Sequence, residues 1–223
     1  MNILKYNSII FDCDGVLINS NKIKTQAFYE FALPFGKSFA LKFKNFHVEN
    51  GGVSRYEKIK HLYEKILKKK IDNKSLKSEA KRYGELISKK ILNAEISTGL
   101  NVLRKNNKHA CWSVVSGGDQ EDLRELFKKN GLVKFFDENI FGSPRSKSQI
   151  IIEEAKNILK RPVLFIGDSK YDMDTADQFD MDFIFLKNWS EWDLDVVPND
   201  LICFGSIKDL AQETSICNTK SQR

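Results

Sequence analysis

The run NSIIFD at residues 7–12 is a short apolar stretch that ends in an acid, and CDG follows it at residues 13–15. A short run rich in β-branched and aromatic residues is typical of a buried strand. The acids and the glycine that follow it are typical of a loop. We therefore expect a strand covered on both faces, with a polar loop at its carboxyl end.

Strands and helices alternate in the second half of the chain. The sequence predicts further strands at residues 111–116, 138–141, 162–167 and 182–186. It predicts helices at residues 98–105, 119–130, 147–159 and 171–179. Such alternation implies a parallel sheet with helices on both faces. The predicted fold class is therefore α/β, with a Rossmann-like parallel sheet as its core.

Residues 19–96 interrupt this alternation because they contain no convincing strand. Helical patterns are predicted there at residues 24–31, 54–67 and 75–92. An α/β core that is interrupted after its first strand by a helical domain explains both patterns. The predicted division is a core of residues 1–18 and 97–211, an inserted helical domain of residues 19–96, and a flexible tail of residues 212–223.

The composition is that of an ordinary globular protein. The 223 residues are 41% hydrophobic and 30% charged, which excludes collagen-like, disordered and disulfide-scaffold classes. No apolar run approaches the roughly 18 residues that a membrane span needs, and residues 1–14 lack the pattern of a signal peptide. The four cysteines, at positions 13, 111, 203 and 217, show no metal or disulfide spacing. We therefore expect reduced thiols, a cytoplasmic location and no membrane partner.

The positive charge is concentrated in the inserted domain. Residues 19–96 contain 16 Lys and 2 Arg against 1 Asp and 7 Glu, whereas the whole chain has a net charge of +6. Such a split indicates either a solvated lysine-rich helical surface or an anionic partner. The aromatic residues among these lysines recur at helical spacing, which suits packing as well as base stacking. We favour the solvated surface and expect no nucleic-acid partner.

Polar residues follow the predicted strands at the point where each strand ends. Because the carboxyl ends of parallel strands meet at one edge of a sheet, their side chains converge on one site. Each residue alone has an ordinary explanation as a cap, turn or surface residue, but all of them fall at the same edge. The residues are Asp12, Asp14, Ser116, Gly117, Asp168 and Asp172, with Lys147 at the start of a predicted helix.

The residue types at this edge indicate a particular chemistry. Closely packed carboxylates repel one another unless a cation lies among them. A ligand set made of oxygen atoms alone favours Mg²⁺. The hydroxyl of Ser116, the glycine amides and the ammonium of Lys147 are typical ligands of a phosphate group. The site therefore indicates magnesium-assisted phosphoryl transfer, with Mg²⁺ as the cofactor.

Four segments carry a resemblance to a known family. IIFDCDGVL, VVSGG, SPRSK and FIGDSKYDMDTA resemble the four motifs of the haloacid dehalogenase superfamily. Within it, the chain resembles the phosphoglycolate phosphatase and β-phosphoglucomutase group, in which a helical cap is inserted after the first motif. The resemblance covers essentially the whole core, and residues 19–96 take the position of the cap.

The resemblance implies roles for the acidic residues. Asp12 would be the nucleophile that forms an aspartyl phosphate, and Asp14 would protonate the leaving oxygen and then activate water. The carboxylates of Asp12 and Asp168 and the main-chain carbonyl of Asp14 would bind Mg²⁺. Asp172 would orient Lys147 or hold a metal-bound water. Because halide needs no protonation, the second acid of the Asp-x-Asp pair favours phosphate esters as substrates.

The resemblance also implies phosphate-binding and substrate-binding residues. Ser116 and the amide of Gly117 would hold phosphoryl oxygens, and Lys147 would neutralise charge on the phosphate and the nucleophile. Lys24 lies near the place where the mutase group has a cap histidine. Arg55, beside a glycine pair and a helix start, would form an anion clamp, although a surface arginine in a connecting turn explains it equally well. We expect Arg55 and Lys24 to contact the substrate.

The leading prediction is a Mg²⁺-dependent phosphatase that hydrolyses a small phosphomonoester, either a sugar phosphate or a phosphoglycolate-like acid. One alternative is a phosphomutase of the β-phosphoglucomutase type, which returns the phosphoryl group to a sugar. Another is a binding protein without catalytic activity on the same fold. The predicted partner is the small phosphate ester alone, and the sequence leaves the oligomeric state open.

Overall fold

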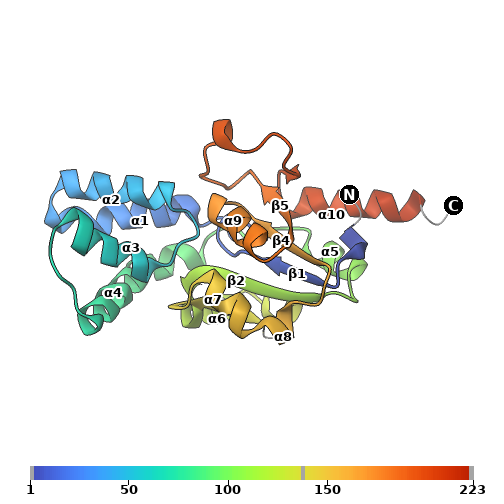
Figure 1. Cartoon of the computed structure of the whole chain (residues 1–223), viewed down its shortest axis with the longest axis horizontal. Helices are drawn as coiled ribbons and strands as arrows, with labels where there is room; N and C mark the ends of the chain where they lie inside the picture. The colour runs from blue at the N-terminus through green and yellow to red at the C-terminus, as the bar shows by residue number, and fades with distance from the viewer. Residues whose placement is uncertain (1–2, 137–138, 221–223) are drawn as a thin grey trace.

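A six-stranded parallel sheet forms the core of the protein (Figure 1). The computed structural model describes residues 3–136 and 139–220. The strand order is β3-β2-β1-β4-β5-β6, which confirms the predicted α/β class. The strands are β1 (Ser8–Phe11), β2 (Cys111–Asp119), β3 (Ile140–Ser143), β4 (Val163–Gly167), β5 (Asp182–Leu186) and β6 (Cys203–Phe204).

The first strand lies at the centre of the sheet, between β2 and β4. Phe11, its last residue, is paired with Val114 on one side and with Ile166 on the other. The chain builds outward from β1 through β2 to β3 and then crosses back to β4 on the other side of β1. The strand order therefore reverses beside β1, which makes the end of β1 the topological switch point where ligands bind in such folds. All four residues of β1 are buried, as expected for a strand covered on both faces.

Helices cover both faces of the sheet. Ile9 and Phe11 belong to the core cluster beneath α5, α6 and α10, whereas Ile10 belongs to the cluster beneath α7, α8 and α9. Alternate residues of one strand thus point to opposite faces. These helices are α5 (Leu100–Asn106), α6 (Gln120–Lys129), α7 (Lys147–Glu153), α8 (Ala155–Ile158), α9 (Lys170–Gln178) and α10 (Ile207–Lys220), with 3₁₀ turns at Ile3–Lys5, Val133–Phe135 and Leu194–Val196.

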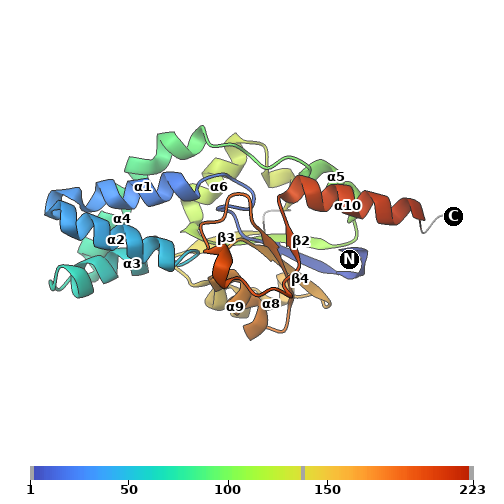
Figure 2. The ribbon, with the colours of Figure 1, turned by 90° about the horizontal axis from the view of Figure 1, so that it is seen from above.

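Four helices form the inserted domain, called the cap below. They pack side by side at one end of the molecule, on the left in Figures 1 and 2. Their shared core contains Phe28 and Tyr83, whose rings stack with centroids 4.1 Å apart. The helices are α1 (Asn21–Ala32), α2 (Lys37–Glu49), α3 (Arg55–His61) and α4 (Asn73–Leu92), with a 3₁₀ turn at Leu33–Phe35 and a π-helical turn at Leu62–Ile66.

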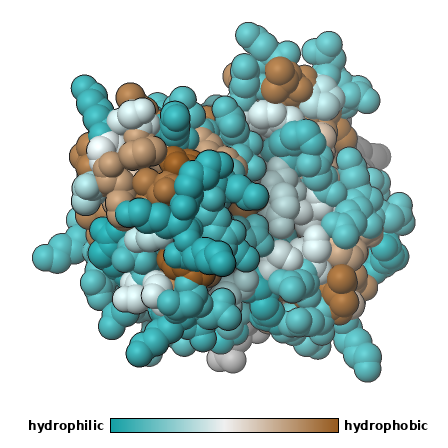
Figure 3. All heavy atoms as spheres, turned by 60° about the vertical axis from the view of Figure 1, so that its left-hand side comes forward, coloured by the Kyte–Doolittle hydropathy of each residue, from teal (hydrophilic) through white to brown (hydrophobic). Residues whose placement is uncertain are grey.

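Two chain segments that run side by side join the cap to the core. The main-chain N–H of Asn19 donates to the carbonyl of Glu95 (2.9 Å), and that of Ser97 donates to the carbonyl of Leu17 (2.9 Å). Figure 3 brings the cap side of the molecule forward and shows a mostly hydrophilic surface. None of the described helices combines the length and apolarity that crossing a membrane requires.

The C-terminal helix differs from the sequence prediction. A flexible tail is expected at residues 212–223, whereas the structure continues α10 through residues 212–220. The helix forms because one face of its first half is buried against α5. The buried residues, at helical spacing, are Ile207, Leu210, Ala211 and Thr214. Residues 221–223, the Cys217 side chain and Glu138, the first residue of one predicted strand, lie outside the described part of the chain.

Candidate active site

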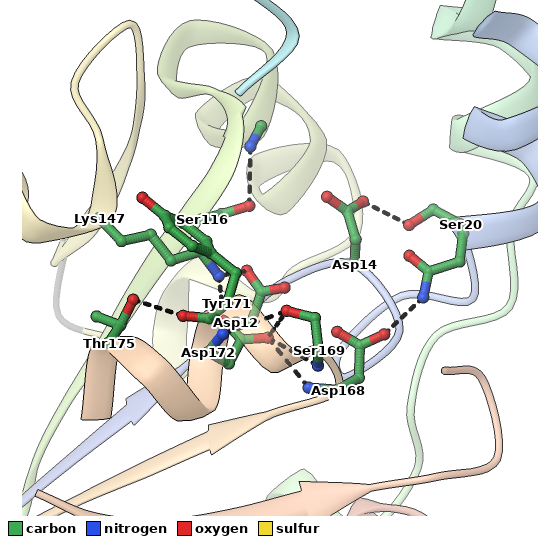
Figure 4. A network of polar contacts seen from close by, with 12 residues as sticks. Asp12, Asp14, Ser20, Ser116, Lys147, Asp168, Ser169, Tyr171, Asp172 and Thr175 are labelled. Carbon is green, nitrogen blue, oxygen red and sulfur yellow. Dashed lines mark hydrogen bonds and ion pairs between the residues drawn. The ribbon is translucent and has the colours of Figure 1, made fainter. Parts of the chain in front are cut away.

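The candidate active site lies at the carboxyl ends of β1, β2 and β4, where charged side chains point toward one another (Figure 4). Asp12 follows β1 and Asp168 follows β4. The loop after β1 turns at Gly15 with φ at +74°, and a β-carbon there would lie 2.0 Å from Oδ2 of Asp168. Only a glycine lets this loop lie against the end of β4. The structure thus brings Asp12, Lys147, Asp168 and Asp172 together, as the strand ends led us to expect.

Lys147 is buried between two carboxylates. Its Nζ lies 2.9 Å from Oδ1 of Asp12 and is also ion-paired with Oδ1 of Asp172, and its side chain is 0% exposed. The other oxygen of Asp172 accepts hydrogen bonds from the hydroxyl of Ser169 (2.7 Å) and from the main-chain N–H groups of Asp168 and Ser169. Because Asp172 is held from two sides, it fixes the position of the Lys147 ammonium beside Asp12.

The donor set fits a divalent cation. Carboxylate oxygens of Asp12, Asp168 and Asp172 lie within 4.8 Å of one another, and all three residues are buried. Asp172 is already occupied by its own hydrogen bonds, so Asp12 and Asp168 are the two carboxylates available to a metal. With Asp14, four carboxylates face the ammonium groups of Lys147 and Lys24. The four carboxylates and two ammonium groups have a formal net charge of −2, which one Mg²⁺ would neutralise.

Protonation equilibria at the site reflect the same excess of negative charge. Burial raises the pKa of Asp12 to about 7, and the charges of Asp172 and Asp14 add to this effect while Lys147 opposes it. Burial, followed by the charges of Asp172 and Asp12, raises the pKa of Asp168 well above its usual value. A bound cation would relieve this repulsion, so the two carboxylates are suited to exchange protons for a metal.

Asp14 points away from this cluster and toward the cap. Its Oδ1 accepts a hydrogen bond of 2.5 Å from the hydroxyl of Ser20, and its Oδ2 is ion-paired with Lys24 of α1. Burial raises the pKa of Asp14, but the charge of Lys24 and the hydrogen bonds from Lys24 and Ser20 outweigh this effect and lower it. Lys24, expected to contact the substrate, therefore contacts the residue expected to act as the acid. Ser20 was not singled out from the sequence.

The last residues of β2 lie directly beneath a turn of the cap. Ser116 is buried, and its hydroxyl accepts a hydrogen bond of 3.0 Å from the N–H of Gly118. A β-carbon at Gly117 would lie 2.1 Å from the carbonyl oxygen of Gly52, so the two glycines touch main chain to main chain. The cap therefore closes over the loop expected to hold the phosphate.

Arg55 of the cap forms ion pairs with two carboxylates of the core. Its Nη2 lies 2.9 Å from Oδ2 of Asp119, its Nη1 lies 2.7 Å from Oδ2 of Asp122, and the hydroxyl of Tyr56 donates to Asp119 (2.9 Å). Gly84 of α4 leaves room for this arrangement, because a β-carbon there would lie 2.8 Å from Nη1. Arg55 was expected to contact substrate. It lines the pocket between the cap and the core, and its terminal nitrogens join the cap to α6. Asp119 and Asp122 were missed because sequence spacing gives no sign of a contact across domains.

A pocket of about 350 Å³ lies between the cap and the core. Its walls include Asp12, Asp14 and Asp168 from the core and Lys24 from the cap. A volume of this size suits a small ligand. Further cap residues on its walls that sequence reasoning did not select are Asn21, Phe28, His47, Lys58 and Tyr83.

Comparisons with known proteins agree with this fold. The sequence model of the family described as haloacid dehalogenase-like hydrolase matches residues 9–186. A phosphorylated carbohydrates phosphatase from Thermotoga maritima is 25% identical over 179 residues, which cover 76% of this chain and 79% of that protein.

Solved structures show the same fold. A β-phosphoglucomutase from Clostridium difficile aligns with a TM-score of 0.68 at 17% identity, over 98% of this chain and all of that one. A hydrolase from Pseudomonas syringae aligns with a TM-score of 0.70 at 18% identity, over 94% of this chain and 98% of that one. At these identities the similarity establishes the architecture of the whole chain, cap included.

Proposed function

Because the chain belongs to the haloacid dehalogenase-like hydrolases, we propose that it is a Mg²⁺-dependent phosphatase that hydrolyses small phosphomonoesters through an aspartyl phosphate on Asp12. The observation that carries this proposal is the buried Lys147, held by Asp172 against Asp12 and next to Asp168. The similarity to a phosphorylated carbohydrates phosphatase supports the substrate class. Burial of this many charged groups in one place has a cost that a structural role does not require.

In the first step, a carboxylate oxygen of Asp12 attacks phosphorus in line with the leaving oxygen. The new O–P bond replaces the bond to the leaving alcohol, and Asp14 donates a proton to that alcohol. In the second step, water attacks the phosphorus of the aspartyl phosphate and gives a proton to Asp14. The products are inorganic phosphate and free Asp12, so atoms and protons balance over the cycle.

The remaining groups position the phosphate and offset its charge. Ser116 and the amide of Gly117 hold phosphoryl oxygens, and Lys147 lies between the phosphate and the nucleophile. Most catalysis of phosphoryl transfer consists of such positioning and charge stabilisation. Asp12, Asp168 and the main-chain carbonyl of Asp14 would hold Mg²⁺, which would supply further positive charge at the phosphate.

Asp14 is suited to exchange a proton because its partners can respond to its charge. In the structure it is paired with Lys24 and Ser20, which favour the ionised form that would accept a proton from water. To act as the acid in the first step it must be protonated. The charge of a bound phosphate would raise its pKa toward that state.

The test is phosphate release from sugar phosphates, phosphoglycolate and an aryl phosphate, each with Mg²⁺ and with EDTA. We expect turnover that requires Mg²⁺ and that the substitution Asp12→Asn abolishes. Asp172→Asn is expected to reduce kcat about 10-fold to 100-fold because Lys147 loses its positioning partner. The control Asp177→Asn alters an exposed carboxylate of the same helix, α9, and should leave the activity unchanged.

The alternatives predict different products. A phosphomutase would return the phosphoryl group to a sugar, so substrate would be converted to an isomer with little release of phosphate. A binding protein would bind phosphate esters and turn none of them over. Turnover without Mg²⁺, or full activity of Asp12→Asn, would contradict the proposed mechanism.

A further inference from the structure

A lysine and a histidine of the cap are buried together on the wall of the active-site pocket. Lys58 of α3 is 2% exposed and His47 of α2 is 7% exposed, and both line the pocket that contains Asp12 and Asp14. The Nζ of Lys58 lies 2.7 Å from Nδ1 of His47. Burial, followed by the charges of Lys58 and Lys24, lowers the pKa of His47 well below its usual value. The imidazole is therefore neutral, and Lys58 donates to Nδ1.

Lys58 is a buried cation without a matching anion. Among the residues that the structure describes, no carboxylate lies within 4.0 Å of its ammonium. The charged groups that act on its pKa are Lys24, Asp14, Glu191 and Lys147. The two carboxylates among these groups already have partners. Asp14 is paired with Lys24 and Ser20, and Glu191 accepts a hydrogen bond from the hydroxyl of Thr25. A buried charge that is not paired costs free energy, and the cost disappears when an anion binds beside it.

The other walls around Lys58 are aromatic. Its Nζ lies 5.5 Å from the centroid of the Phe28 ring, which stacks on Tyr83 and lies 4.4 Å from the His47 ring. These rings hold His47 and Lys58 in place and keep water away from the ammonium. Burial, followed by the charge of Lys24, lowers the pKa of Lys58 to about 7. The site is thus pre-organised, and an anion bound beside Lys58 would raise its pKa and favour its charged form, as expected of a subsite for an anion.

We infer that Lys58, positioned by His47, binds a second anionic group that the leaving group of the substrate carries. This inference rests on the proposed function and narrows its substrates to phosphate monoesters with a second anion, either a carboxylate or another phosphate. The transferred phosphate already has its own ligands in Ser116, Gly117 and Lys147, so Lys58 remains for the leaving group. Arg55 is a weaker candidate because both of its terminal nitrogens are ion-paired with the core.

The pocket volume sets the scale of the substrate. At about 350 Å³ it lies near the lower end of the range for ligand pockets. A set of two-carbon esters therefore makes the sharpest test, because its members differ only in the group at the far carbon. Phosphoglycolate carries a carboxylate there, ethylene glycol bisphosphate carries a phosphate, and 2-hydroxyethyl phosphate carries a neutral hydroxyl.

The experiment measures kcat/KM for these three esters with the wild-type protein and with Lys58→Met. We expect the wild type to prefer one or both of the doubly anionic esters over the neutral one by about 10-fold to 100-fold, the range of a charge-assisted hydrogen bond. Lys58→Met should lower that ratio by a similar factor, mainly through KM. The ester with the larger loss identifies the second anion as carboxylate or phosphate.

Two further variants complete the design. Lys60→Met alters an exposed lysine of the same helix and should leave both the activity and the ratio unchanged. His47→Gln should lower the ratio through KM with little change in kcat, as expected of a residue that acts by positioning Lys58. Melting curves of each variant check that it is folded.

The preference for doubly anionic esters can also be measured without turnover. Calorimetry with the Asp12→Asn protein gives the dissociation constant of each of the three esters. A wild type without preference, or equal losses of Lys58→Met on all three esters, would overturn the inference while leaving a phosphatase in place. If no ester is hydrolysed, but the binding preference exists and depends on Lys58, the phosphatase proposal fails and the anion subsite stands. If binding shows no preference either, both fail.

Discussion

Lys24 of the cap is ion-paired with Asp14 of the core, so a residue of one domain sets the charge state of the proposed acid in the other. The contact lies on α1, only ten residues after Asp14, on the segment that leaves the core for the cap. The acid is therefore coupled to the position of the cap. Four expectations follow from this and other contacts, and each has its own measurement.

Removing Lys24 should shift the pH dependence of the reaction. Burial and the loss of the neighbouring charge both favour the protonated form of Asp14, so Lys24→Met raises its pKa. Because kcat/KM requires a protonated Asp14 in the first step, its decline at high pH should move upward by about one unit or more. The measurement is the pH profile of kcat/KM, with the exposed Lys22 of the same helix, changed to Met, as the control. An unchanged pH profile of kcat/KM would show that Lys24 does not set the pKa of Asp14.

Metal binding should stabilise the protein more strongly as pH rises. In the metal-free protein burial raises the pKa of Asp12 from its ordinary 3.8 to about 7, and it also raises the pKa of Asp168. Both groups favour the folded state when protonated, so that stability is present below pH 4 and is lost as pH rises to about 7. Mg²⁺ replaces the protons, so its apparent affinity should increase over the same range.

The measurement is the melting temperature at several pH values with EDTA and with Mg²⁺. The increase on adding Mg²⁺ should grow from pH 5 to pH 8, and Asp168→Asn should largely remove it. A Mg²⁺ effect that is independent of pH would show that these two carboxylates are not the metal ligands.

The two ion pairs of Arg55 should contribute unequally to stability. The pair with Asp122 is the shorter, but the Asp122 side chain is 56% exposed whereas that of Asp119 is 12% exposed. Solvent screens the exposed pair, so it contributes only about 0–1 kcal/mol, and the buried pair should contribute more. Asp119→Asn keeps the side-chain oxygen that caps α6 and should still cost more than Asp122→Asn in the free energy of unfolding. Urea unfolding of both variants decides the order.

Lys58→Met should stabilise the protein while it weakens substrate recognition. The pKa of Lys58 is about 7 in the folded protein, below its usual 10.5, so the cost of its charge is complete below pH 7 and falls between pH 7 and pH 10.5. We expect the melting temperature to rise by about 2–4 °C at pH 6.5, the effect of about 1 kcal/mol in a chain of this size. The gain should shrink at pH 9.5. A loss of stability at pH 6.5 would mean that Lys58 is adequately paired in the free protein.

Sequence patterns predicted the parallel core because the signals for it are local. NSIIFD and PVLFIG contain buried strands that pair in parallel. Because parallel strands place their carboxyl ends at one edge of the sheet, the sequence alone predicted that Asp12 and Asp168 lie close together. The α2 helix and the short β6 were missed. The buried face of α2 consists of only Ala40, Phe43 and His47. Leu41 and Val48 are apolar but exposed, so the apolar residues of this helix do not repeat with a clear helical period.

Contacts between elements could not be predicted in the same way. Lys58 and His47 lie on different helices, and Arg55 finds its carboxylates more than 60 residues further along the chain. Periodicity shows which residues share a face of one helix, but not which faces meet. For that reason the glycine pair and the helix start beside Arg55 indicated an anion clamp there, whereas the packing points to Lys58.

The contact between Gly117 and Gly52 has one more consequence. Since neither residue has a side chain, a single added methyl group at residue 117 would act as a wedge between the two domains, 2.1 Å from the carbonyl of Gly52. Gly117→Ala would prevent the cap from closing fully on the core, while every reactive group stays in place. Such a protein would separate two tasks that the wild type performs together, assembling the chemistry and keeping bulk solvent out of it.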